Sequence, residues 1–223
     1  VGVDIPALQA EVAAGRAAAA ADALSAALSA DPDNPRLLYD HGVTAYAAGR
    51  LEDALVSLDR AESLGRRWLA RQARFQKGNV EYRIGVAARS SNLEETIARW
   101  RESMRDFSEV LKDSEEPRAR ENFEFVRREL VGLLMADAKR NLKEGAKPGG
   151  PPAERIEKLR NAFERFTAAK EIEPGNSEAT TGVQLSRDEL AQALTQEGTR
   201  KAETARLVQP RPNEAPVPRP DYK

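Results

Sequence analysis

The sequence of 223 residues contains no cysteine and one histidine, His41. Without cysteine, the chain has no disulfide, zinc–thiolate site, iron–sulfur cluster or cysteine nucleophile. A single histidine excludes a metal site built on two or three histidines and argues against a Ser–His–Asp triad. The residue inventory therefore leads us to expect neither a metal nor a cofactor.

The chain also lacks an excess of either charge and any long apolar run. Lys and Arg total 35 against 36 Asp and Glu, for a formal net charge of -1. That balance argues against a nucleic-acid binder, which normally carries a basic excess or patch. No apolar run approaches the roughly 20 residues that span a bilayer, so we expect no membrane span in this chain. Aromatic residues are only 5% of the sequence, so the core must be built mainly from Ala, Leu and Val.

What the sequence does contain is a repeat of 34 residues in its first part. Two Ala- and Leu-rich segments, 7–30 and 35–64, are each divided by a Gly–Arg pair. Ala has the highest helix propensity and Gly punctuates helices, so each segment predicts two helices. Four pairs of residues are 34 positions apart: Gly15 and Gly49, Ala20 and Ala54, Leu24 and Leu58, and Ala27 and Ala61.

This period, with small residues where helices approach closely, resembles the tetratricopeptide repeat (TPR). Residues 1–34 match the positions of that repeat with Gly15, Ala20, Leu24, Ala27 and Pro32. Residues 35–68 match it with Gly42, Ala54, Leu58 and Ala61. Leu8 replaces the first Gly of the motif, and Arg66 replaces the Pro of the second repeat. The resemblance implies an all-α solenoid of helical hairpins.

The later part of the chain predicts stretched repeats. We expect a third repeat from about Arg71, with a first helix that closes at Gly85 and an insertion over 86–96 before the second helix. Pro117 suits the first turn of a long helix over 117–144. Further helices are expected over 153–172, with Ala162, Phe166 and Ala169 at repeat positions, and over 177–207, as a polar cap. The expected organisation is a TPR-like array over 1–144, a Gly/Pro loop over 145–152, a helical pair over 153–207 that closes the array, and an extended Pro-rich tail over 208–223.

Both ends of the sequence allow two interpretations. The start at Val1, without Met, fits an exported chain whose signal peptide has been removed, and a trimmed chain fits equally well. The final residues 221–223, Asp-Tyr-Lys, are either native or the start of an affinity tag.

Few residues suggest chemistry. The glycines follow the repeats and form no phosphate-binding loop. The pairs at 94–95 and 115–116 are glutamates that we interpret as solvated charge at helix starts. His41 is interpreted as a packing or surface residue. Arg67, Arg71 and Arg74 share one helix face and suit either an acidic ligand or solvated ion pairs. We therefore expect no catalytic residue.

The repeat geometry gives the best functional signal. By resemblance to TPR arrays, the first helices of the repeats line a concave groove that binds a protein partner. The groove positions predicted for the second and third repeats are Arg36, Tyr39, Val43, Tyr46, Gln72, Phe75, Asn79, Tyr82 and Arg83. Aromatic, amide and Arg side chains together are typical of interaction hot spots. The alternative is that Tyr39, Tyr46 and Phe75 fill gaps between helices. A chaperone-type carboxylate clamp would need further Lys and Asn where Val43 and Phe75 stand.

A closer resemblance covers two stretches. Residues 73–85, ARFQKGNVEYRIG, and 121–130, ENFEFVRREL, look like stretches of the bacterial Bat-type (aerotolerance-associated) TPR proteins. That resemblance implies a cell-envelope association and, as partners, proteins with von Willebrand factor A domains or MoxR-type ATPases. This sequence differs by the expected insertion after Gly85 and by lacking a membrane segment.

The leading hypothesis is a non-enzymatic scaffold that binds a peptide or helix in its groove and helps to assemble an envelope complex. Its expected location is exported or periplasmic. The alternative is a permanent structural subunit of a larger exported assembly, with the Pro-rich tail running along a neighbour. An enzyme is the third reading, for which no residue is a candidate.

Overall fold

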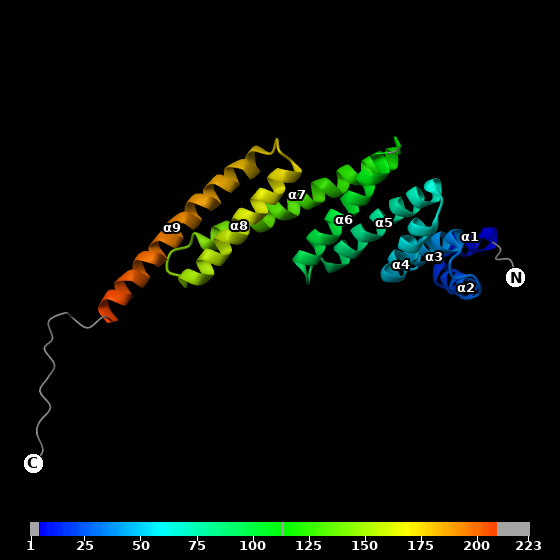
Figure 1. Ribbon diagram of the computed structural model, residues 1–223, viewed down its shortest axis with the longest axis horizontal. Coiled ribbons are helices and arrows are strands. Elements are labelled where there is room, and N and C mark those ends of the chain that lie inside the picture. Colours follow the sequence, from blue (N-terminus) through cyan, green and yellow to red (C-terminus); the bar gives the residue numbers. More distant parts are fainter. Residues whose placement is uncertain (1–4, 113, 209–223) are drawn as a thin grey trace, which may run out of the picture. The chain divides into compact units, whose positions relative to one another are not determined.

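The computed structural model describes residues 5–112 and 114–208, and all regular structure in these ranges is α-helical (Figure 1). The described helices are α1 (Ile5–Ala13), α2 (Ala17–Ala30), α3 (Pro35–Ala47), α4 (Leu51–Leu64), α5 (Arg67–Ala88), α6 (Leu93–Lys112), α7 (Pro117–Gly145), α8 (Pro152–Ile172) and α9 (Ser177–Val208). The chain divides into two compact units, residues 1–130 and 131–223, with the division inside α7. The fold class is therefore the expected all-α arrangement of helical hairpins.

The first two hairpins follow the 34-residue period in detail. Gly15 and Gly49 adopt φ values of +79° and +77° at the turns between their helices, a left-handed conformation that favours glycine. Between the hairpins, the side chain of Asn34 caps α3 by accepting hydrogen bonds from the backbone N–H groups of Arg36 and Leu37. Pro35 then occupies the first turn, where its missing N–H costs nothing.

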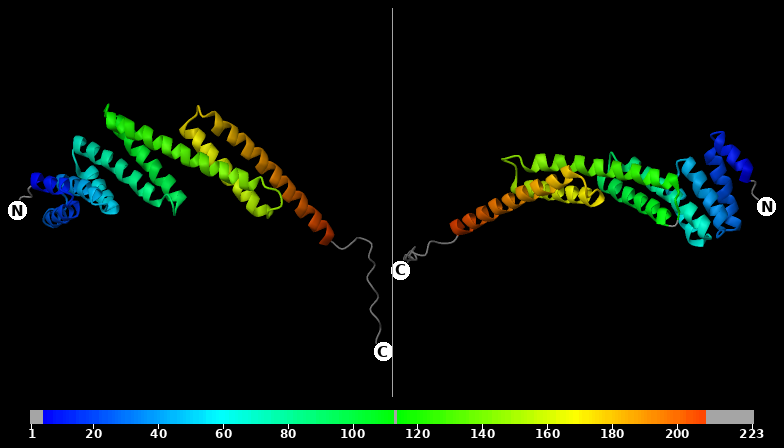
Figure 2. Two further views of the ribbon diagram at one scale, coloured as in Figure 1. Left: turned by 180° about the vertical axis from the view of Figure 1, so that it is seen from behind. Right: turned by 90° about the horizontal axis from the view of Figure 1, so that it is seen from above.

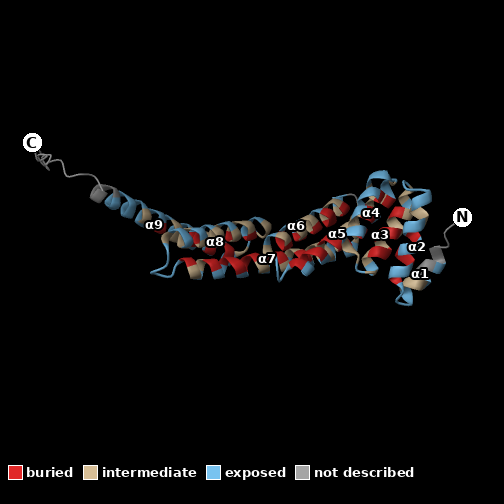
Figure 3. Ribbon diagram, turned by 90° about the horizontal axis from the view of Figure 1, so that it is seen from below, coloured by how far each residue is buried: buried red, intermediate tan, exposed pale blue. Residues whose placement is uncertain are grey.

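Small side chains form the contacts between these helices. Ala20, Ala54 and Ala61 are almost fully buried, and so are Leu24 and Leu58. A Cβ on Gly42 would lie 2.5 Å from Leu58 Cγ and 3.2 Å from the carbonyl oxygen of Ala54, so α3 and α4 approach too closely for any other residue there. Figure 3 shows the buried residues on the facing sides of the helices.

The third hairpin corrects the sequence prediction. The first helix does not close at Gly85, because α5 continues to Ala88, and α6 already begins at Leu93. The expected insertion over 86–96 is therefore one more helical turn on α5 and a short connection. Gly85 is buried inside the helix because the Trp100 indole of α6 lies where a Cβ would project.

The second unit contains the rest of α7 with α8 and α9. Helices α8 and α9 form a hairpin and lie side by side in the views of Figure 2. Buried Asp137 of α7 accepts a hydrogen bond of 3.3 Å from Arg165 Nε of α8. The repeat positions Ala162, Phe166 and Ala169 are buried as expected. Helix α9 runs to Val208, and the predicted tail after it lies outside the described residues.

Candidate functional site

Three first helices of the N-terminal unit, α3, α5 and the start of α7, carry the predicted binding residues and their neighbours. Helices α3 and α5 are in contact. Helices α5 and α7 are joined by the Asn79–Asn122 hydrogen bond, the Tyr82–Phe125 ring contact and the Arg89–Glu129 ion pair. We call the residues on this side the α3/α5/α7 face: Tyr39, Tyr46, Trp68, Gln72, Gln76, Asn79, Tyr82, Arg83, Val86, Asn122 and Phe125.

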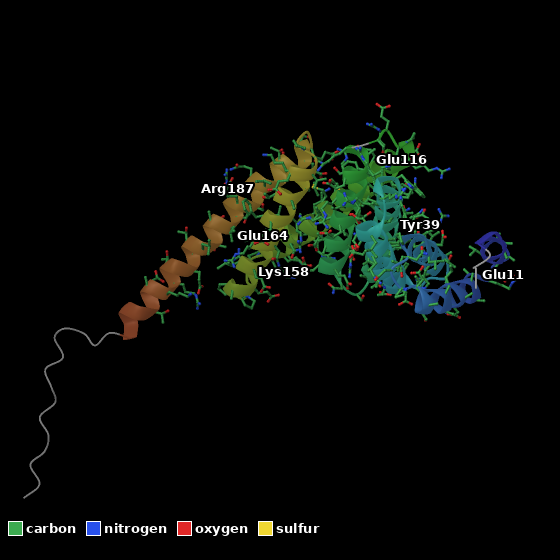
Figure 4. All side chains as sticks on the ribbon, turned by 45° about the vertical axis from the view of Figure 1, so that its right-hand side comes forward. Glu11, Tyr39, Glu116, Lys158, Glu164 and Arg187 are labelled. Carbon is green, nitrogen blue, oxygen red and sulfur yellow. The ribbon has the colours of Figure 1, made fainter. Side chains whose placement is uncertain are left out.

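A row of polar side chains joins α5 and α7 on this face. Tyr39 of α3, the residue labelled in Figure 4, lies near the Gln76 end of this row, where the Gln76 side chain acts on the pKa of its hydroxyl. Asn79 Nδ2 donates to Gln76 Oε1 at 3.1 Å, and Asn122 Nδ2 donates to Asn79 Oδ1 at 2.9 Å. Each amide nitrogen carries two hydrogens, so Asn79 and Asn122 each keep one N–H that points to no described partner in this row. The row therefore both joins the helices and offers donors to a ligand.

Aromatic rings form the second feature of the face. The Tyr82 ring stacks on buried Trp100 with centroids 5.6 Å apart, and the Phe125 ring meets Tyr82 edge-on at 5.5 Å. Tyr82 is only half-buried, and Phe125 remains 44% exposed. Phe75 packs on Phe107 of α6 at 5.7 Å and is also half-buried. These rings thus fill space between helices on one side and remain accessible on the other.

The residues predicted on α3 lie closer to the core. Val43, Tyr46 and Tyr39 are half-buried and pack against the buried residues of the second hairpin. Burial raises the pKa of Tyr39, whereas the nearby Gln76 side chain acts in the opposite direction. Arg36 is exposed, donates to Asp40 Oδ2 at 2.9 Å and lies 5.7 Å from the centre of the Tyr39 ring. Its guanidinium covers this end of the face.

Sequence reasoning missed three exposed apolar residues on the same face. Trp68, Val86 and Phe125 are 53%, 41% and 44% exposed. Positions 68, 72, 75, 79, 82 and 86 follow each other at steps of three or four, so they form one stripe along α5. This spacing is visible in the sequence. It was missed because groove positions were assigned from a TPR repeat of standard length, in which residues 68 and 86 are not groove positions.

The Arg cluster that the sequence singles out lines a cavity of about 160 Å³ between α4, α5 and α6. Its Arg74 is already held by Glu62, and it lies 3.8 Å from Glu109. Its Lys77 neighbour on α5 bonds Asp59 and Glu62 at 2.7 and 2.9 Å. The ion-pair interpretation therefore accounts for a large part of this cluster.

His41 and Asp106 are among the titratable groups that are buried outside the face. His41 Nδ1 lies 2.7 Å from Ser57 Oγ, and burial lowers the pKa of this imidazole. Burial also raises the pKa of the Asp106 carboxyl of α6 to about 6, although the positive charge of Lys77 opposes the shift. Asp106 was not singled out in the sequence, since nothing in its neighbours signals burial. Within residues 5–112 and 114–208, no group of three or more His, Asp or Glu residues is placed to hold a metal ion.

The comparisons agree with this architecture. Residues 11–76 match the family model described as tetratricopeptide repeat, a stretch from the end of α1 into α5. Together with the consecutive helical hairpins, this match supports a TPR protein. TPR domains bind protein partners and are typically non-enzymatic.

A search of curated proteins gives no match. Among the described helices, none is long and apolar enough to cross a membrane. The finer Bat-type resemblance rests on residues 73–85 and 121–130 alone.

Proposed function

We propose that the chain is a non-enzymatic scaffold that holds an extended segment of a partner protein on the α3/α5/α7 face. The observation that carries the proposal is the row from Gln76 through Asn79 to Asn122. An extended peptide has no internal hydrogen bonds, so its backbone carbonyls need donors such as the second N–H of each amide.

The exposed apolar residues supply the other half of the interaction. Trp68, Val86 and Phe125 present apolar surface beside the polar row. Removing such apolar side chains from water favours association, and aromatic residues are enriched in interaction hot spots. Amide donors set the register of the peptide, and the apolar residues provide the affinity.

The cellular setting of this scaffold is also a proposal. By its resemblance to Bat-type proteins over residues 73–85 and 121–130, the chain acts in a bacterial envelope complex and is exported or periplasmic. The same resemblance proposes a protein with a von Willebrand factor A domain or a MoxR-type ATPase as the partner. Fractionation of host cells tests the location independently of the binding face.

Site-specific crosslinking tests the binding face. A photoreactive amino acid replaces Gln72, which is exposed on the α5 stripe, or Val56, which is 62% exposed on α4. We expect position 72 to crosslink a specific host protein, through one defined peptide identified by mass spectrometry, and position 56 not to. Introducing Phe125→Ala into the crosslinking chain should reduce the product at least tenfold. Equal products from both positions, or no effect of Phe125→Ala in a folded chain, contradict the proposal.

A further inference from the structure

The chain itself contains a segment with the chemistry that suits the α3/α5/α7 face. Residues 209–220, QPRPNEAPVPRP, include five prolines and follow the last described helix, α9. Proline fixes φ near −65° and removes a backbone donor, so such a segment favours the extended polyproline II conformation. Little conformational entropy remains to be lost when such a segment binds.

Polyproline II segments are recognised by aromatic surfaces with nearby hydrogen-bond donors. The face has both features, because the Tyr82 and Phe125 rings meet at 5.5 Å and the Asn79–Asn122 pair lies one turn away along α5 and α7. Proline rings pack flat on aromatic rings, and the carbonyls between them accept from the amide N–H groups. A helical partner would keep its carbonyls in its own hydrogen bonds and leave these donors unused.

The segment also has a suitable length and composition. Twelve residues in polyproline II would span about 37 Å, whereas packed helices lie about 8–10 Å apart, so a segment of this length is long enough to cross α3, α5 and α7. The motif Pro-Arg-Pro occurs twice, at Arg211 and Arg219. Arg beside aromatic rings gains a cation–π attraction. The fold already uses this contact, since the Arg36 guanidinium lies 5.7 Å from the centre of the Tyr39 ring.

We propose that the α3/α5/α7 face binds residues 209–220 of a second copy of this chain, a proposal that rests on the proposed function of the face. Every copy carries one face and one segment, so reciprocal exchange between two copies closes a two-fold dimer. The two contacts act together, and their combined strength exceeds that of a single peptide contact. Self-association then competes with partner binding for the same surface.

Sedimentation velocity on full-length chains tests this proposal. The wild type should form a concentration-dependent dimer. Two full-length variants should each associate at least tenfold more weakly: Phe125→Ala, which lacks the face, and a chain in which all five prolines of 209–220 are alanine. An equimolar mixture of these two variants should form a heterodimer weaker than the wild-type dimer, because one chain still has the segment and the other the face, and only one of the two reciprocal contacts is intact. Val56→Ala, which removes exposed apolar surface elsewhere, should dimerise as the wild type does.

Each other outcome overturns the proposal. A wild type that stays monomeric while a synthetic 209–220 peptide binds the proline variant shows that the segment occupies the face of its own copy. A dimer that survives both variants uses another surface. If Phe125→Ala fails to fold, Val86→Ser replaces it on the same face. Crosslinking of a host protein from position 72 without self-association would leave the scaffold function intact and reject the second copy as the occupant.

Discussion

Asn122 Nδ2 donates to Asn79 Oδ1 across 2.9 Å, although 43 residues separate the two side chains in the sequence. The bond joins the start of α7 to the middle of α5, where Asn79 in turn donates to Gln76 Oε1. The first helices α5 and α7 are thus connected by side chains, in addition to the apolar core below them.

This connection can be measured with a double-mutant cycle. We expect Asn79→Ala and Asn122→Ala each to lower the free energy of unfolding by about 1 kcal/mol, the usual net value of a hydrogen bond. The double variant should lose less than the sum, with a coupling of about 0.5–1.5 kcal/mol, measured by chemical denaturation. Additive losses would mean that the two amides do not interact in solution. Gln72→Ala, exposed on the same stripe, is the control and should change stability by less than about 0.5 kcal/mol.

Two glycines of long helices should respond in opposite directions to alanine. At Gly85 a Cβ would meet the buried Trp100 indole, so Gly85→Ala should destabilise the fold by about 1–3 kcal/mol despite its better helix propensity. At Gly132 of α7 no atom of the described residues lies within 4 Å of the added Cβ. Gly132→Ala should therefore raise stability by up to about 1 kcal/mol. Thermal unfolding followed by circular dichroism distinguishes the two, and equal effects would contradict the tight α5–α6 contact.

Gly85 also shows which features of the fold can be predicted from the sequence and which cannot. The period that pairs Gly15 with Gly49 predicts the first two hairpins, because both glycines adopt positive φ at turns. Position 85 is also a glycine, but for a different physical reason: it leaves room for the side chain of Trp100 within a continuous helix. A glycine that ends a helix and one that admits a neighbouring ring look alike until the packing partner is known.

Part of the α3/α5/α7 face could be named from the sequence, and its role in binding stays a prediction. Tyr39, Asn79 and Tyr82 could be named because they occupy repeat positions on the first helices. Asn122 and Phe125 could not, since their role depends on which turn of α7 lies beside α5. That register is set by tertiary packing between helices of unequal length, and local propensity does not specify it.

Protonation of Asp106 in acid should stabilise the folded chain. Burial raises the pKa of its carboxyl from 3.8 to about 6, so this group contributes stability below pH 3.8 that is lost as the pH rises through about 6. Asp106→Asn cannot ionise. At pH 7 the variant should be more stable than the wild type by at most about 3 kcal/mol, the equivalent of the pKa shift. The difference should vanish below pH 4. A difference that is independent of pH, in urea unfolding at pH 4 and pH 7, would refute the burial of an ionisable group here.

The contribution of His41 to stability should have the opposite pH dependence, and the titration of its imidazole can be measured directly. Burial lowers the pKa of the imidazole below 6.5, so its contribution to stability is present above pH 6.5 and is lost as the pH falls through the lower pKa of the folded state. Because His41 is the only histidine in the sequence, its ring protons give one assignable pair of NMR signals. Their titration midpoint should lie below 6.5 in the folded chain and return to about 6.5 in urea.

Two variants separate the titration of His41 from its hydrogen bond. Ser57→Ala removes the 2.7 Å contact and should cost about 1 kcal/mol at pH 7.5, while the loss of stability in acid remains. His41→Gln has no imidazole, so the part of the acid destabilisation that comes from this site should disappear. A titration midpoint of the His41 imidazole at or above 6.5 in the folded chain would show that the imidazole is solvated. It would contradict the tight packing of α3 and α4 around His41 and Ser57.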